Sequence, residues 1–248
     1  MFSVNFKARM ASLALIGAAF AIPGAVNAGV VVKSTGPSSG TYPVGRQVAD
    51  NASITLRQGD KITVLTDSGT RVMQGPGTFN VGGGATRTRA RFSSLTQQGA
   101  RRVRTGAVRS GDMGEVTRPN IWLVDVNTGG PMCVVDLAGV RLWRPEQDVA
   151  QTYSIVNQAT QDSLDVAFVG TEAMRAVDPN GLVIADGTSY RFTAPVSEES
   201  GEASSVVITF KLVSEEIDTP AALASALYSR GCTSQLELMA NTAEAEAE

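Results

Sequence analysis

The amino-acid sequence predicts a mostly β protein with an Arg-rich helical linker and short C-terminal helices. Three observations support this class. Short runs rich in Val, Ile and Thr alternate apolar with polar residues, and most of them end at Gly, Pro, Asn or Asp. One central stretch lacks this alternation and is crowded with arginine. The hydrophobic content of 43% is typical of a globular chain rather than a disordered one.

The first 28 residues have the order of a cleavable secretory signal. Lys7 and Arg9 precede a short apolar run, a Pro-Gly break and the small residues Val26-Asn27-Ala28. The run is shorter than the roughly 20 residues that cross a bilayer as a helix. We therefore expect cleavage near Ala28 and a periplasmic mature protein that begins near Gly29. We expect no transmembrane segment in that mature chain.

Residues 29–84, the first β module, are predicted to form hairpins. Apolar and polar residues alternate between clusters of Gly, Asp and Pro, which is typical of half-buried strands joined by tight turns. The expected strands lie at residues 30–33, 54–57, 61–66, 70–74 and 78–81.

Part of the first β module resembles FecR-type periplasmic domains. The resemblance rests on Leu56-Arg-Gln-Gly-Asp60, on Ile62-Thr-Val-Leu65 and on Gly69-Thr-Arg-Val-Met-Gln-Gly-Pro-Gly77, a strand entry followed by a hairpin and a Gly-Pro turn. It implies a periplasmic sensor or scaffold domain, often attached to a membrane-spanning regulator of a sigma factor. No cytoplasmic helical domain precedes the apolar segment here, which departs from the regulator pattern. The whole arrangement resembles exported alphaproteobacterial proteins.

Residues 85–118 are predicted to form an Arg-rich helical linker. Phe92, Leu95, Gly99 and Val103 would form one narrow apolar face of a helix. The arginines are either solvated or paired with acidic residues of the modules, or they contact an anionic lipid surface, an envelope polymer or an envelope protein. The candidate contact arginines are Arg87, Arg89, Arg91, Arg101, Arg102 and Arg104.

Residues 119–214, the second β module, are predicted to form an immunoglobulin-like β-sandwich, because short strands recur at the spacing typical of that fold. Trp122 and Trp143 are expected in its core. Arg141 and Arg144 are expected on the surface of a strand, with stacking of one of them on an aromatic ring as the alternative. The expected strands lie at residues 121–126, 132–135, 140–143, 152–156, 164–169, 182–185, 189–192 and 205–213.

Residues 215–248 are predicted to form C-terminal helices and an acidic tail. Asp218-Thr219-Pro220 is typical of an N-cap followed by proline in the first turn, and the alanine-rich run to Tyr228 favours a helix. A second, short helix is expected at residues 233–239. The glutamate-rich residues beyond it are expected to fray.

The two cysteines, Cys133 and Cys232, are expected to form a disulfide, because an even count in an exported chain favours pairing. Two separately buried thiols are the alternative. A catalytic redox pair is disfavoured because the sequence has no Cys-x-x-Cys spacing. A bond between the two cysteines would tie the C-terminal segment to the start of the second β module.

The chain contains no histidine, which excludes Ser-His-Asp and Cys-His catalytic units and histidine-bound catalytic zinc. No motif predicts a catalytic residue, a cofactor or a metal site. Removing Lys7 and Arg9 would change the net charge from -3 to -5, which argues against nucleic acid as a partner.

Two functions remain open from the sequence. The first is a non-catalytic exported binding or scaffold protein of the cell envelope, with an accessory role in envelope signalling implied by the resemblance. The alternative is a carboxylate-based hydrolase acting on an envelope glycan. The hydrolase would need two carboxyl groups about 5–10 Å apart in one cleft.

Overall fold

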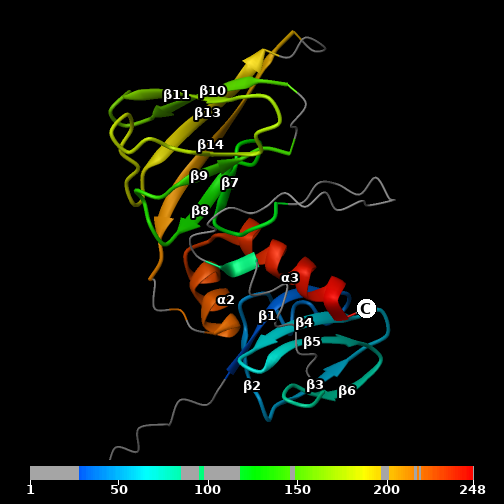
Figure 1. Cartoon of the computed structure of the whole chain (residues 1–248). Helices are drawn as coiled ribbons and strands as arrows, with labels where there is room; N and C mark the ends of the chain where they lie inside the picture. Colours follow the sequence, from blue (N-terminus) through cyan, green and yellow to red (C-terminus); the bar gives the residue numbers. More distant parts are fainter. Residues whose placement is uncertain are drawn as a thin grey trace, which may run out of the picture.

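A computed structural model describes residues 28–84, 95–97, 118–145, 149–196, 201–214, 217 and 219–247 of the chain. Strands dominate this part, and two helices stand at its C-terminal end, which confirms the mostly β class (Figure 1). Among the described residues, neither helix has the length and apolar character needed to cross a membrane. Residues 1–27 of the predicted signal lie outside the described residues, as do all the contact arginines: Arg87, Arg89, Arg91, Arg101, Arg102 and Arg104.

The first β module consists of a four-stranded sheet, in the order β2-β1-β4-β5, and a two-stranded sheet of β3 and β6. All neighbouring strands are antiparallel. The five strands predicted from alternation are present, and the short β2 is an addition that the sequence reasoning missed. The strands are β1 (Ala28–Thr35), β2 (Gln47–Ala49), β3 (Ser53–Leu56), β4 (Lys61–Thr66), β5 (Gly69–Gln74) and β6 (Gly77–Asn80).

The turn between β3 and β4 is organised by Asp60, a residue of the FecR-type resemblance. Its buried carboxylate accepts hydrogen bonds from the backbone N–H groups of Ser38 (2.8 Å) and Arg57. Burial alone would raise the pKa of Asp60, but these hydrogen bonds outweigh it and the pKa lies below its ordinary value. Gly59, with φ of +84°, supplies the left-handed conformation of the turn. Asp60 therefore has a structural role here.

The second β module pairs a five-stranded sheet, in the order β11-β10-β13-β14-β8, with a three-stranded sheet, in the order β12-β9-β7. The pairs β8–β14 and β7–β9 are parallel, and the other strand pairs are antiparallel. The strands are β7 (Leu123–Asp125), β8 (Gly130–Val134), β9 (Arg141–Trp143), β10 (Gln151–Asn157), β11 (Ser163–Phe168), β12 (Met174–Ala176), β13 (Ser189–Val196) and β14 (Ala203–Leu212).

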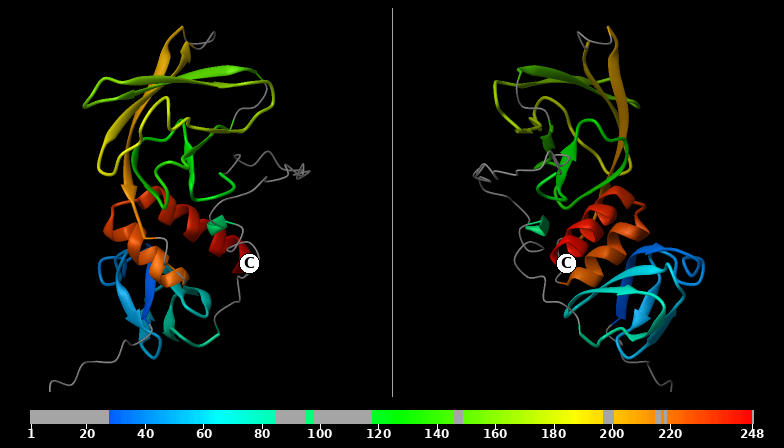
Figure 2. Two further views of the ribbon diagram at one scale, coloured as in Figure 1. Left: turned by 60° about the vertical axis from the view of Figure 1, so that its left-hand side comes forward. Right: turned by 90° about the vertical axis from the view of Figure 1, so that its right-hand side faces the viewer.

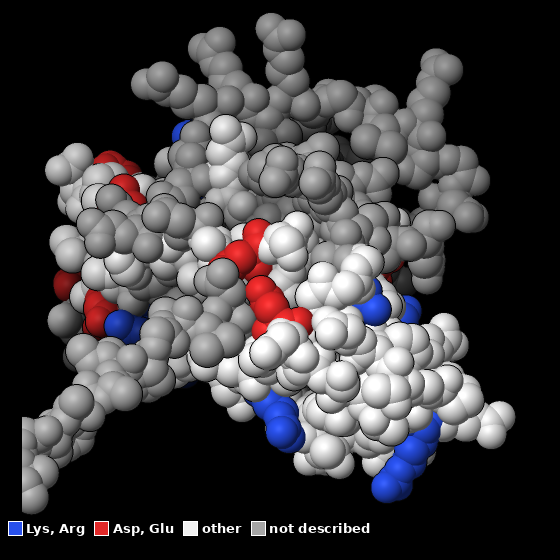
Figure 3. Space-filling model, turned by 90° about the horizontal axis from the view of Figure 1, so that it is seen from below, with Lys and Arg blue, Asp and Glu red and all other residues white. Residues whose placement is uncertain are grey.

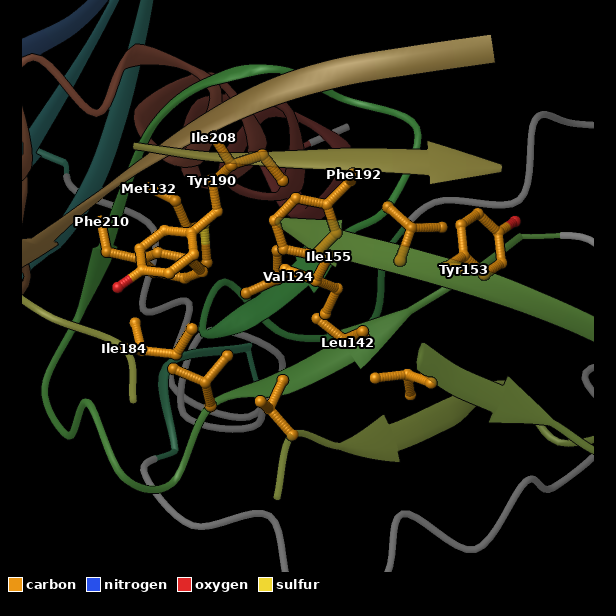
Figure 4. Close-up of a cluster of buried hydrophobic side chains, with 14 of the residues drawn as sticks. Val124, Met132, Leu142, Tyr153, Ile155, Ile184, Tyr190, Phe192, Ile208 and Phe210 are labelled. Atoms are coloured by element: carbon orange, nitrogen blue, oxygen red, sulfur yellow. The ribbon is translucent and has the colours of Figure 1, made fainter. Parts of the chain in front are cut away.

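Apolar side chains from both sheets form the core of the second β module. Val124 and Leu142 come from the small sheet, and they pack with Ile155, Phe192 and Phe210 from the large one (Figure 4). The two sheets therefore enclose one hydrophobic layer. The finer immunoglobulin-like arrangement stays a prediction.

The strand predicted at residues 182–185 is wrong, although its alternation is real. Leu182 and Ile184 are buried and Val183 is 71% exposed, but no strand pairs with them. The hydroxyl of Tyr190 donates to the Val183 carbonyl (2.9 Å) and accepts from the Ala185 N–H (3.0 Å). A buried tyrosine thus satisfies backbone groups that a neighbouring strand would otherwise bind. The third strand of the small sheet is β12 instead.

Arg144 is fully buried, which corrects the surface position expected for it. Its guanidinium donates to the carbonyl oxygens of Val149, Gly170 (2.8 Å) and Glu172 (2.9 Å). The guanidinium carbon also lies 5.1 Å from the centre of the Phe168 ring. Backbone carbonyls therefore compensate for the loss of water around a buried cation.

The C-terminal helices are α2 (Pro220–Ser229) and α3 (Thr233–Ala247). The prediction of the first is confirmed: Thr219 is the N-cap and its hydroxyl accepts a hydrogen bond from the Ala222 N–H. The prediction of a short second helix with a frayed tail is wrong, because α3 continues to Ala247. The residues Leu236, Met239, Ala240 and Ala243 form its buried face.

Both helices lie between the two β modules (Figures 1 and 2). One hydrophobic cluster joins Val30 and Leu65 of the first β module, Ile121 and Val213 of the second, and Leu227 of α2, together with the buried face of α3. The three parts of the chain therefore share a core at this place. The C-terminal segment, predicted to contact the start of the second β module, contacts the first as well.

A disulfide and a set of buried hydrogen bonds attach α3 to the second β module. Cys133 in β8 forms the predicted disulfide with Cys232, which directly precedes α3, and both residues are fully buried. The buried amide of Gln235 accepts from the Cys133 N–H (2.7 Å) and donates to the carbonyls of Cys133 (2.9 Å) and Ile121 (2.8 Å). All three bonds pair groups that are shielded from water.

A charge cluster attaches the other end of α3 to the first β module. The carboxylate of Glu244, 12% exposed, lies 3.0 Å from the Lys33 ammonium and 3.4 Å from that of Lys61. It also accepts a hydrogen bond of 2.6 Å from the Thr63 hydroxyl. Burial by itself would raise the pKa of Glu244, but the hydroxyl and the two ammonium groups lower it below its ordinary value.

Removal of the disulfide should destabilise the protein strongly. The bond joins residues 99 positions apart, so in the chain-entropy model it stabilises the fold by about 5 kcal/mol. For a chain of this size, reduction should lower the unfolding midpoint by about 10 °C. The measurement is thermal unfolding with and without reductant, with Cys133→Ala/Cys232→Ala as the matched variant. Equal midpoints, or two titratable thiols in the native oxidised protein, would contradict this.

Glu244→Gln should destabilise the protein by about 1 kcal/mol at neutral pH, because the carboxylate loses two cationic partners. Because the pKa of Glu244 is lower in the folded protein than in the unfolded chain, its ionised carboxylate stabilises the fold at any pH above the unfolded pKa. This stabilisation is lost as the pH falls through the folded pKa. The difference in unfolding free energy should therefore vanish in acid. Urea titrations across pH measure it, and Glu237→Gln, exposed on the same helix, is the control. A difference independent of pH would refute the role of this charge.

Candidate functional site

A groove of about 380 Å³ lies where the C-terminal helices meet the first β module. We call it the helix groove. Its walls come from β1, from the loop that follows β1 and from both helices, so it exists only because the C-terminal segment returns to the first module. The lining residues are Val32, Lys33, Ser34, Val44, Tyr228, Thr233, Leu236, Glu237 and Ala240.

The floor of the helix groove is apolar and belongs to the shared core. Val32, Leu236 and Ala240 are buried members of the hydrophobic cluster that joins the two modules, and the half-buried Val44 packs against it. A side chain entering the groove would meet these apolar groups and displace water from them. The floor is therefore suited to an apolar group of an occupant.

Tyr228, at the end of α2, is the one aromatic residue of the lining and is 45% exposed. Its ring lies directly against Gly45, where an added Cβ would come 2.2 Å from a ring carbon. Gly45 also has φ of +85° and donates its N–H to the Val31 carbonyl (2.8 Å). Only glycine satisfies both constraints, and the close approach holds the ring beside the groove.

Two charged residues line the helix groove, and they differ in their partners. The Lys33 ammonium donates to the Asn241 amide oxygen and to the Glu244 carboxylate, both at 3.0 Å. The exposed Glu237 forms no ion pair or hydrogen bond with any residue that the structure describes. The lining therefore presents one unpaired negative charge to an occupant.

Ser34 lines the helix groove, but its side chain is on the opposite face of the sheet from α3, because in the register with β4 it is paired with Ile62, which belongs to the separate hydrophobic cluster of the first β module. Its hydroxyl oxygen is inaccessible to solvent and has no hydrogen-bond partner among the described residues. A molecule in the helix groove therefore does not reach this hydroxyl.

The edge of β1 forms part of the same wall. The register with β2 covers Ala28, Gly29 and Val30, whereas the pairing with β4 continues to Thr35. Within the described chain, residues 32–35 thus have a strand neighbour on one side. Val32, Lys33 and Ser34 all line the groove although they are consecutive. The register between β1 and β4 shifts between Val31 and Lys33, which interrupts the alternation of faces, and Val32 and Lys33 both lie on the side of the C-terminal helices.

Of the predicted site residues, the structure brings together Cys133 and Cys232, which form the disulfide next to α3. The contact arginines lie outside the described residues. Viewed from below, uncharged residues cover much of the described surface, Asp and Glu side chains gather near the middle of the view, and Lys and Arg side chains do not form one continuous patch (Figure 3). Among the described residues, no group of three or more Asp, Glu or Cys side chains is placed to hold a metal ion.

The sequence reasoning missed the lining of the helix groove. One signal was available: Leu236, Met239, Ala240 and Ala243 recur at helical spacing, which indicates a buried face that continues beyond the short helix predicted. That face implies packing against another part of the chain. Nothing in the sequence indicates that this other part is the first β module.

Three comparisons with known proteins find no counterpart for this chain: no protein-family model, no curated protein and no solved structure matches it. The FecR-type assignment therefore continues to rest on the residues quoted for it.

Proposed function

We propose that this protein is a non-catalytic, exported binding or scaffold protein of the cell envelope and that the helix groove is its contact site. The observation that carries the proposal is the groove itself: it combines an apolar floor with a carboxylate that has no partner among the described residues. An apolar pocket with a few polar groups is the usual form of a binding site.

The composition of the lining favours binding over glycan hydrolysis. A carboxylate-based hydrolase needs two carboxyl groups that act on one bond from about 5–10 Å apart. The groove lining holds one carboxylate, Glu237. The other nearby carboxylate, Glu244, is occupied by Lys33 and Lys61.

The attachments of α3 support a preformed contact surface. The disulfide and Gln235 connect α3 to the second β module, and Glu244 connects it to the first. A groove held from both sides loses little conformational entropy when an occupant binds. Such rigidity suits a scaffold that joins other envelope components. An accessory role in envelope signalling follows from the FecR-type resemblance.

Export to the periplasm is supported by the leader and by the disulfide, since disulfides persist in oxidising compartments. β1 begins at Ala28, so cleavage at the predicted site would leave the strand from Gly29 to Thr35 intact.

Export makes a direct prediction: in a Gram-negative host, the protein should be recovered from the periplasmic fraction with an N-terminus near Gly29. N-terminal sequencing and fractionation measure this. Ala28→Phe, which places a bulky side chain at the cleavage site, should leave the leader attached. Recovery of the uncleaved wild-type chain from the cytoplasm would contradict the proposal.

A photo-crosslinking residue at Tyr228, introduced as p-benzoylphenylalanine, should capture an envelope component in cells. Tyr228 lines the groove and is 45% exposed, so a photoreactive group at this position is close to an occupant of the groove. The same substitution at Val183, which is 71% exposed in the second β module, is the control. We expect cross-linked products from position 228, and we expect Glu237→Arg to abolish them.

Products of the same kind from both positions, or products that Glu237→Arg leaves unchanged, would mean that the helix groove is not the contact site.

A further inference from the structure

We infer that the N-terminal end of β14 pairs with the same segment of a second copy of this chain. The paired segment is Ala203, Ser204 and Ser205, in antiparallel orientation, so that the large sheets of two second β modules continue into one another. This segment belongs to the second β module and does not line the helix groove. The inference therefore goes beyond the proposed function and does not depend on it.

The hairpin of β13 and β14 extends beyond the strands on either side of it (Figures 1 and 2). β10 pairs with β13 only as far as Thr193, and β8 pairs with β14 only from Ile208 onwards. The three residues from 203 to 205 are all exposed, although successive residues of a strand point to opposite faces. Both faces of this segment are therefore open.

The outer edge of the segment is open as well. Backbone groups along β14 alternate between its two neighbours: the Phe210 N–H donates to the Thr188 carbonyl (3.1 Å), on the β13 side, and the Val213 N–H donates to a carbonyl of β8 (2.9 Å). The same alternation directs the N–H and C=O groups of Ala203 and Ser205 to the β8 side. β8 does not reach that far, and no described strand pairs with these groups there.

This edge lacks the devices that usually prevent strand addition, which are charged side chains, proline and bulges. β14 carries no charged residue and no proline from Ala203 to Phe210, and the extra residue of the register shift lies on β13. The opposite edge strand of the same sheet, β11, carries Asp165 near its centre. Of these two edges, the exposed end of β14 is the one suited to pairing.

A second copy of the chain fits this edge because the segment is complementary to itself. With a two-fold axis at Ser204, Ala203 of each copy lies opposite Ser205 of the other, and each such pair exchanges both backbone hydrogen bonds. Glu202 of each copy would lie opposite Val206 of the other, so the two carboxylates stand at opposite ends of the paired segment. A parallel orientation would place them side by side, which is unfavourable.

The ends of the segment determine the register. With the axis at the first residue of β14, Ser205 would face Gly201 of the other copy, but Gly201 has φ of +68° and is not extended. With the axis at Ser205, the second copy would have to reach Val207. The chain at Gly129 already lies there, since an added Cβ on Gly129 would come 3.1 Å from the Val207 carbonyl oxygen. The register with its axis at Ser204 meets neither obstacle.

Pairing over so short a segment predicts a weak and reversible dimer, because stable complexes bury at least roughly 1,200 Å². Sedimentation equilibrium of the purified mature protein should show an average mass that rises with concentration up to about 1 mM, which populates even a dimer with a millimolar Kd. Ser205→Pro removes an outward N–H group without removing a bond to β13, so it should keep the mass at that of one copy. Ser205→Thr retains the N–H group and is the matched control.

Disulfide trapping tests the register. In the proposed dimer the two Ser204 residues face each other with Cα atoms about 4.5 Å apart, which is within the range that a disulfide spans. Ser204→Cys should therefore form linked dimers under mild oxidation, measured on non-reducing gels. Ser163→Cys, at an exposed position of β11, is the control and should stay largely unlinked. Adding Ser205→Pro to Ser204→Cys should reduce the yield to that of this control.

A mass that stays at one copy at every concentration would overturn the inference, and so would a dimer that Ser205→Pro leaves intact. Linkage of Ser204→Cys that is no faster than that of Ser163→Cys would overturn it as well. Thermal midpoints establish that each variant is folded. If Ser205→Pro does not fold, the comparison of Ser204→Cys with Ser163→Cys decides the question by itself.

Discussion

The packing of α3 between the two β modules is the interaction on which the rest of the structure depends. Its N-terminal end is attached to the second β module by the disulfide and by the buried amide of Gln235, and its C-terminal part is attached to the first by Glu244. Its apolar face fills the space between them. Two modules that are separate in sequence therefore share one core, closed by the last segment of the chain.

The helix groove is a consequence of this arrangement. A helix laid across a twisted sheet leaves space along the strand that it does not cover, and here that space lies beside β1. Val32, Leu236 and Ala240 give this space an apolar floor. Because Lys33 is paired with Glu244, the carboxylate of Glu237 is the charge of the lining without a partner among the described residues. Packing that stabilises the fold thus also forms the surface that is suited to binding.

Local features were predictable because their physical causes are local. Alternation and turn residues indicated the strands of the first β module except the short β2, and Thr219 with Pro220 marked the start of α2. The predictions failed where a distant side chain decided the outcome. Tyr190 satisfies the backbone of Val183 and Ala185 without a strand, and three carbonyls from other segments allow Arg144 to be buried.

The sequence by itself determined the mostly β class and the absence of histidine chemistry, and its two cysteines favoured the disulfide that the structure contains. Only the tertiary structure decided the extent of α3, its place between the modules and the composition of the groove. The physical reason is the separation along the chain: Lys33 and Glu244 are more than 200 residues apart, and so are Val32 and Ala240. A pattern within one segment reports which face is apolar, but it carries no information on which distant segment covers that face.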